Sequence, residues 1–161
     1  LWMTPVYMVL LSGIFKIVSI QLFTARMFSS IIAAYTILIA YQIGKNLNFS
    51  KSRIFLIIGF IVTDLVFLKY SHISRMESLC FFFGILSIYF LSLKREIPTQ
   101  KIYLFFSGIS ISMSFLSHPF GIIHSLAILG FLLYKKDLNF KNIFLIFLAS
   151  LIPLSVWAMY I

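Results

Sequence analysis

Charged residues are scarce in this 161-residue sequence: they make up 11% of the chain, with only 4 Asp and Glu among them. A soluble domain is typically about 25% charged, so this chain has too few charges to cover a water-soluble globule. Disorder is excluded as well, because disordered chains are poor in aromatic and branched apolar residues, whereas 61% of this chain is hydrophobic. The composition therefore predicts an integral membrane protein.

Cysteine is almost absent, and the lone Cys80 lies inside an apolar run. An intramolecular disulfide is therefore excluded, and cysteine usage says nothing about the redox compartment. Three histidines without a Cys/His cluster do not predict a zinc site. His118 and His124 would lie about 240° apart on a regular helix, on different faces. We assign no metal and no cofactor, and these residues do not support a divalent-cation site.

Long apolar runs are abundant. A spanning helix needs about 20 mostly apolar residues, and backbone groups in lipid must be satisfied within the segment, which favours helices over strands. Because the sequence starts at Leu1 and ends inside an apolar run, we expect residues 1–161 to be one transmembrane domain truncated at both ends. The apolar segments are Val6–Leu22, Met27–Ile43, Ile54–Tyr70, Leu79–Leu93, Ile102–Leu116, Phe120–Tyr134 and Ile143–Ile161.

The basic residues orient this predicted bundle. The chain has 13 Lys and Arg and a formal net charge of +9, and nine of these cations fall in the loops at 44–53, 94–101 and 135–142. Under the positive-inside rule those loops are cytoplasmic. Most of the positive charge thus marks topology, and we expect no nucleic-acid partner. The fold class predicted is an all-α, polytopic membrane helix bundle in the cell (inner or plasma) membrane, in contact with membrane lipids.

The first apolar segment is ambiguous. Residues 6–22 contain Lys16, so the segment could span the membrane, or it could lie along the outer interface with Lys16 at the headgroups. We therefore expect about six spanning helices plus one N-terminal juxtamembrane or embedded helix.

A few basic residues are predicted to lie on the outer side of the membrane. The positive-inside rule disfavours this position, so their presence there calls for an explanation. Arg26, Lys69, His72, Arg75 and His118 fall there. Arginine can grip a phosphate with two hydrogen bonds, and lysine acts as a point charge. These residues are candidates for binding an anionic group such as a phosphate, and snorkelling of interfacial side chains to lipid headgroups is the alternative.

Three further outer or intramembrane positions have two interpretations each. Ser74 and Glu77 form an S-x-x-E pattern that is typical of a helix-capping box, or Glu77 orients Arg75. Asp64 lies about 9 Å inside the expected end of the segment that finishes at Tyr70. Intramembrane acids commonly face a bundle interior or a cavity and are functional candidates, whereas the alternative for Asp64 is an interhelical hydrogen bond.

Helix packing is the simpler explanation for His124 and for the serines of segment 102–116. A lone histidine is more commonly a packed or hydrogen-bonded residue than a ligand. Ser110, Ser114 and Ser117 share one helix face, and Gly108 and Ser112 form a small-xxx-small pair. This pattern favours close helix–helix contact.

Five stretches, in this order, resemble sequence patterns of one enzyme family. Thr4–Tyr7 is similar to "P-P-L-Y", Ala25–Ser30 to "R-L-P-S" and Ala40–Lys45 to "V-Y-L-L-G-R". Ser71–Glu77 is similar to "S-R-x-A-R-x-E/D", and Phe115–Pro119 to "F-L-T-K-x-P". The chain thus resembles the polyprenyl-phosphate-sugar-dependent membrane glycosyltransferases of GT-C type. This group includes protein O-mannosyltransferases, aminoarabinose transferases and Rgt-type lipid A core galacturonosyltransferases.

The resemblance implies an inverting transfer of a sugar from a polyprenyl-phosphate carrier to a lipid, glycan or protein acceptor on the extracytoplasmic face. It implies that Arg75, Arg26, Lys69, His72 and His118 contact the donor phosphate or its surroundings. His72 stands where the family often has Arg, and His118 where it often has Lys. The family's usual catalytic acidic residue lies upstream of Leu1, so no catalytic residue is assigned. The resemblance also places the first segment in the outer loop region.

Two other classes of function stay open from the residues alone. A transporter or channel segment would use Asp64 as an intramembrane proton or ion site; discontinuous helices in paired halves would support it, and the sequence shows no such internal pairing. A non-catalytic membrane subunit would use the small-residue face of segment 102–116 for assembly.

Overall fold

The computed structural model describes residues 5–93, 99–135 and 139–160, and in these ranges all regular structure is helical. The predicted all-α class is therefore confirmed. The elements are α1 (Pro5–Ile17), α2 (Leu22–Asn46), α3 (Lys51–Thr63), α4 (Leu65–His72), α5 (Met76–Ser92), α6 (Thr99–Ser117), the 3-10 turn η1 (Pro119–Gly121), α7 (Ile122–Tyr134) and α8 (Phe140–Tyr160).

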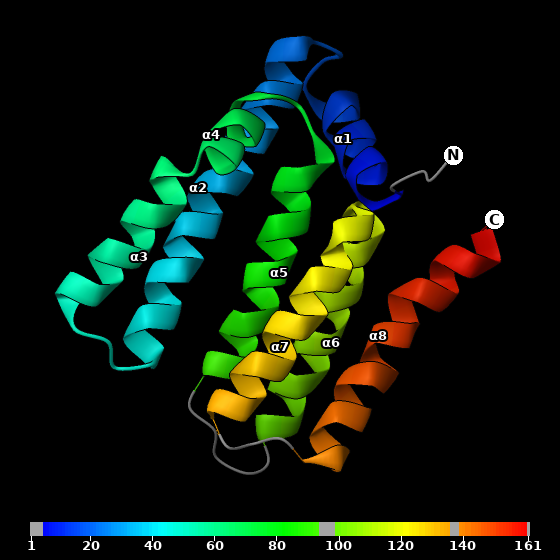
Figure 1. Cartoon of the computed structure of the whole chain (residues 1–161). Helices are drawn as coiled ribbons and strands as arrows, with labels where there is room; N and C mark the ends of the chain where they lie inside the picture. Colours follow the sequence, from blue (N-terminus) through cyan, green and yellow to red (C-terminus); the bar gives the residue numbers. More distant parts are fainter. Residues whose placement is uncertain (1–4, 94–98, 136–138, 161) are drawn as a thin grey trace.

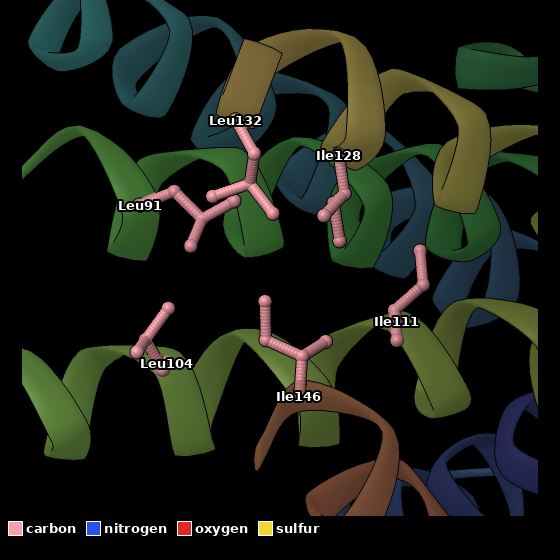
Figure 2. Close-up of a cluster of buried hydrophobic side chains, with 6 residues drawn as sticks. All are labelled: Leu91, Leu104, Ile111, Ile128, Leu132 and Ile146. Atoms are coloured by element: carbon pink, nitrogen blue, oxygen red, sulfur yellow. The ribbon is translucent and has the colours of Figure 1, made fainter. Parts of the chain in front are cut away.

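The centre of the bundle is formed by α5, α6, α7 and α8, which run roughly alongside one another (Figure 1). Their facing side chains are buried, branched aliphatic residues, and Leu132 is fully buried. Figure 2 shows the cluster that they make: Leu91, Leu104, Ile111, Ile128, Leu132 and Ile146.

Close approach between α6 and its neighbours depends on small residues. A Cβ at Gly108 would collide with the backbone carbonyl of Ile146 on α8. Three of the buried serine hydroxyls donate back to carbonyls of their own helix, each at 2.8 Å: Ser110 to Phe106, Ser112 to Ile109 and Ser117 to Met113. The small residues predicted to pack helices together do so. The serines buried along α6 are Ser107, Ser110, Ser112, Ser114 and Ser117.

The predicted helix Ile54–Tyr70 is wrong as a continuous element. It is broken at Asp64 into α3 and α4, which meet at a bend of 62°. Asp64 has an extended backbone, and its Oδ1 accepts a hydrogen bond of 2.7 Å from the amide of Phe67. An aspartate competes with the helix backbone in this way and favours a cap over a helix interior. Asp64 therefore starts a new helix and does not sit within one.

Within the described residues, two helices, α2 and α8, are long and apolar enough to cross a membrane, and the bent α3–α4 pair makes a third if it counts as one span. The apolar helices α1 and α5, and the stretches Lys101–Ser117 and Pro119–Tyr134, are shorter. At about 1.5 Å per residue, the 13-residue α1 is about 20 Å long, against about 30 Å of hydrocarbon core. Residues 6–22 thus do not form one spanning helix.

The helix ends that flank the three basic loops lie together at one end of the bundle (Figure 1). The end of α2 and the start of α3, the ends of α5 and α7, and the starts of α6 and α8 lie together there. The opposite end holds α1, α4, the start of α5 and η1. Lys94, Arg95 and Lys136 fall outside the described residues. The described cations of the basic end are Lys45, Lys51, Arg53, Lys101, Lys135 and Lys141.

Helix α1 is fastened to this opposite end by its first turn. Val6 and Tyr7 are buried and pack with Leu79 of α5 and Leu116 of α6. The Tyr7 hydroxyl also forms a 2.6 Å hydrogen bond with Ser74 Oγ in the α4–α5 connection. The segment around Pro5 therefore supports the turn that carries Arg75.

Candidate functional site

A cavity of about 590 Å³ lies among the α3–α4 bend, the start of α5, η1 and the start of α7. Six titratable side chains line it: Asp64, Tyr70, Glu77, Cys80, His118 and His124. Most of the wall is apolar, and such a combination of an apolar cavity with a few converging polar groups is typical of ligand sites. The apolar wall includes Phe60, Ile61, Phe67, Phe81, Phe120 and Ile123.

Arg75 and Glu77 form an ion pair beside this cavity. Arg75 Nη2 lies 2.6 Å from Glu77 Oε1, and Arg75 Nε donates to Oε2 at 3.2 Å. The guanidinium carbon also lies 5.0 Å from the centre of the Tyr70 ring, which lines the cavity. The carboxylate and the ring hold the guanidinium from two sides. The Arg75 side chain is 44% exposed and the Glu77 side chain only 16%. Arg75 is therefore the member of the ion pair that a ligand can reach.

The capping box predicted for Ser74 and Glu77 is wrong. Helix α5 begins at Met76, its N-cap is Arg75, and no side chain caps it there. Ser74 lies one residue too early and bonds Tyr7 instead. The Ser78 hydroxyl donates to the Arg75 carbonyl at 2.9 Å and helps to fix this turn. Of the two interpretations of Glu77, the geometry favours orientation of Arg75.

Three of the candidate cations lie at the same end of the bundle but outside the cavity lining. Arg26, Lys69 and His72 are exposed. His72 Nδ1 is held against its own helix, 2.9 Å from the Leu68 carbonyl oxygen and 2.8 Å from Ser71 Oγ. These residues add positive charge at this end. Within the described residues, no hydrogen bond or ion pair joins them to Arg75.

His118 does reach the cavity. It precedes Pro119, has an extended backbone and caps η1, where its Nδ1 accepts a 3.2 Å hydrogen bond from the Phe120 amide. In the neutral ring the proton is then on Nε2, because one imidazole nitrogen accepts and the other donates. His118 thus offers the cavity a hydrogen-bond donor.

The expectation that His118 and His124 face different directions is wrong, since both line the same cavity. Continuous helical geometry does not apply, because Pro119–Gly121 form a 3-10 turn between α6 and α7. As predicted, His124 is hydrogen bonded within the bundle: its Nδ1 lies 2.9 Å from Ser114 Oγ on α6. Pro119 indicated a break in the helix, but the sequence did not predict the direction that the chain takes after this break.

Asp64 lines the cavity from the bend of α3 and α4. We predict that Asp64→Ala lowers the free energy of unfolding by about 1 kcal/mol, because the start of α4 loses its cap, whereas Asp64→Asn keeps it. Thermal unfolding of the purified protein in detergent measures both variants. Equal stability of the alanine variant and the wild type would contradict the capping role. Loss of activity in Asp64→Asn at unchanged stability would assign the carboxylate a part in the reaction.

Metal-ligating residues do not gather in the described part of the chain: no three of its His, Cys, Asp and Glu side chains are placed to share an ion. Cys80 is buried beside the cavity, with its Sγ 3.4 Å from Ser114 Oγ. The cavity contact of Tyr70 with Arg75, and the bonds of Tyr7 to Ser74 and of Ser114 to His124, could not be predicted from the sequence, because they join residues in different elements.

Comparison with known proteins identifies the family. Searches of curated proteins and of solved structures find no significant match. The family model described as dolichyl-phosphate-mannose-protein mannosyltransferase matches residues 3–160, nearly the whole chain. This match agrees with the apolar helices of the fold and with the GT-C resemblance in the sequence. The chain therefore belongs to the dolichyl-phosphate-mannose-protein mannosyltransferase family of membrane glycosyltransferases.

Proposed function

We propose that this protein moves a sugar from a polyprenyl-phosphate carrier to a lipid, glycan or protein acceptor, and that the Arg75 turn binds the phosphate of the donor. The observation that carries the proposal is the ion pair of Arg75 with Glu77 at the cavity. Family membership supports the class of reaction.

The chemistry of Arg75 suits a phosphate. A guanidinium has five N–H donors, and Glu77 takes one from Nε and one from Nη2. Three N–H groups are left for a second anion. When the bond between sugar and phosphate breaks, negative charge grows on the departing lipid phosphate, and fixed donors aimed at that charge lower the barrier. His118, which lines the cavity and keeps Nε2 out of its bond to the Phe120 amide, is our second phosphate contact.

Arg26, Lys69 and His72 are proposed as support for this site through their charge. They lie at the same end of the bundle and are exposed, so their positive field attracts an anionic lipid headgroup, although salt screens it. The acceptor hydroxyl needs a general base, and we assign that role to no residue of this chain.

The reaction is proposed to take place on the extracytoplasmic side. The Arg75 turn lies at the end of the bundle opposite the described basic loops (Figure 1), and basic loops are usually cytoplasmic. This arrangement supports an extracytoplasmic position for the Arg75 turn.

The test is a transfer assay with the full-length protein in liposomes. We expect sugar transfer from a polyprenyl-phosphate mannose donor and none from a nucleotide-linked mannose. A parallel preparation with heat-inactivated protein controls for spontaneous hydrolysis of the donor. Transfer from the nucleotide sugar alone would overturn the proposed donor class.

A further inference from the structure

The two histidines of the cavity present opposite hydrogen-bonding atoms to it. Ser114 Oγ donates to the Cys80 carbonyl oxygen at 2.8 Å, across the α5–α6 interface. A hydroxyl has one proton, so Ser114 Oγ can only accept from the His124 Nδ1 that lies 2.9 Å away. Nδ1 of His124 therefore carries the proton, and in the neutral ring Nε2 is an acceptor.

The position of the ring leaves this acceptor free for a ligand. A Cβ on Gly84 of α5 would collide with Cδ2 and Cγ of His124 and lie 2.5 Å from Nδ1, so these atoms are packed against α5. Phe81 lies beside the ring, with the centroids 6.1 Å apart. Within the described residues no group forms a hydrogen bond with Nε2 of His124. This atom is also not among the buried polar atoms that lack a partner, so it is accessible. Since Nδ1 bonds Ser114 and both Cγ and Cδ2 pack against α5, the Cε1–Nε2 edge is the part of the ring left to line the cavity.

We propose that His124 is a sugar-binding residue whose Nε2 accepts a hydrogen bond from a hydroxyl of the donor's sugar. An acceptor nitrogen is unsuited to a phosphate oxygen, which has no proton to give at neutral pH, but it suits a polyol. His118 supplies a donor to the same cavity, so the pair can bind the two kinds of hydrogen-bonding group that a sugar and its phosphate present. The ligand class rests on the proposed function; the orientation of the ring does not.

Two substitutions separate the acceptor from the rest of the side chain. In His124→Asn the amide nitrogen can replace Nδ1–H toward Ser114, and nothing replaces Nε2. In His124→Gln the longer side chain can bring a carbonyl oxygen to the place of Nε2. Binding of polyprenyl-phosphate mannose and of polyprenyl phosphate without sugar is measured for the wild type and both variants. Thermal unfolding confirms that each variant is folded.

We expect His124→Asn to weaken binding of the mannosyl donor about 2- to 10-fold, the range for one neutral hydrogen bond, and to leave binding of the bare phosphate unchanged. His124→Gln should recover part of the lost affinity. If His124→Asn weakens binding of both lipids equally, or if His124→Asn and His124→Gln bind the mannosyl donor equally, His124 only packs within the bundle and the proposal is overturned.

A different result would show that the proposed function itself is wrong. Wild-type protein that binds neither lipid probe would refute the polyprenyl-phosphate donor and the sugar ligand together. The ring assignment is tested separately by ¹⁵N shifts of labelled histidine, which distinguish a protonated Nδ1 from a protonated Nε2. Protonation of Nε2 in His124 would overturn the acceptor assignment whatever the ligand.

Discussion

Replacing Arg75 by alanine should lower the rate of sugar transfer about 100- to 1000-fold, the range measured when one preorganised donor to a developing oxyanion is removed. The substitution removes the three N–H donors that Glu77 leaves for a phosphate, and with them the positive charge that would stabilise the leaving group. It also leaves the Glu77 carboxylate, which is only 16% exposed, without its partner. The measurement is the rate of transfer from polyprenyl-phosphate mannose by protein that is correctly inserted in liposomes.

Two control variants separate geometry from charge. Arg75→Lys keeps the charge and loses the planar fork that holds Glu77 and a phosphate together, so it should recover only a small part of the rate. Lys69→Ala removes an exposed cation at the same end of the bundle, and its effect should be small because water and salt screen it. Equal losses in Arg75→Ala and Lys69→Ala would contradict a specific phosphate contact at Arg75.

Replacing Gly108 by alanine should lower the free energy of unfolding by about 1–3 kcal/mol, the usual cost of overpacking a well-packed interior. The new Cβ meets the backbone carbonyl of Ile146, and a backbone cannot rotate away as a side-chain tip can. Helices α6 and α8 must therefore separate, which loosens the cluster shown in Figure 2. Thermal or denaturant unfolding in detergent measures the change.

Gly130 of α7 offers the matched control. It has no heavy atom within 4 Å of the position of an added Cβ. Gly130→Ala should leave stability unchanged or raise it by up to about 1 kcal/mol, because alanine loses less backbone entropy than glycine in a helix. If both alanine variants unfold alike, the α6–α8 contact at Gly108 is not limiting for stability.

Helix class and membrane character were predictable because they depend on local composition. Apolar runs long enough to require helices in lipid account for the all-α fold. The stripe of Ser110, Ser114 and Ser117 indicated the packed face of α6, since helical periodicity places i, i+4 and i+7 together. The family could be predicted from short motifs whose order, and not any one of them, was informative.

Element boundaries near polar residues were less predictable. The sequence predicted Asp64 as an acid within a continuous helix. Its side chain instead accepts a hydrogen bond from a free amide at the start of a new helix, and the chain bends by 62° there. Ser74 and Glu77 matched a capping box, but Ser74 bonds Tyr7, some 67 residues away in sequence. In both cases a competing hydrogen bond decided the local structure.

The sequence by itself determined that this is a helical membrane protein, which loops carry its positive charge, and that Arg75 and Glu77 share one turn. These properties follow from composition and from neighbours along the chain. The tertiary structure alone decided that Tyr70 and Glu77 hold Arg75 beside a cavity, and that His118 and His124 line that cavity together. Those contacts join α4, α5, η1 and α7, and packing across helices sets their directions, because no periodic pattern extends through a break such as Asp64 or Pro119.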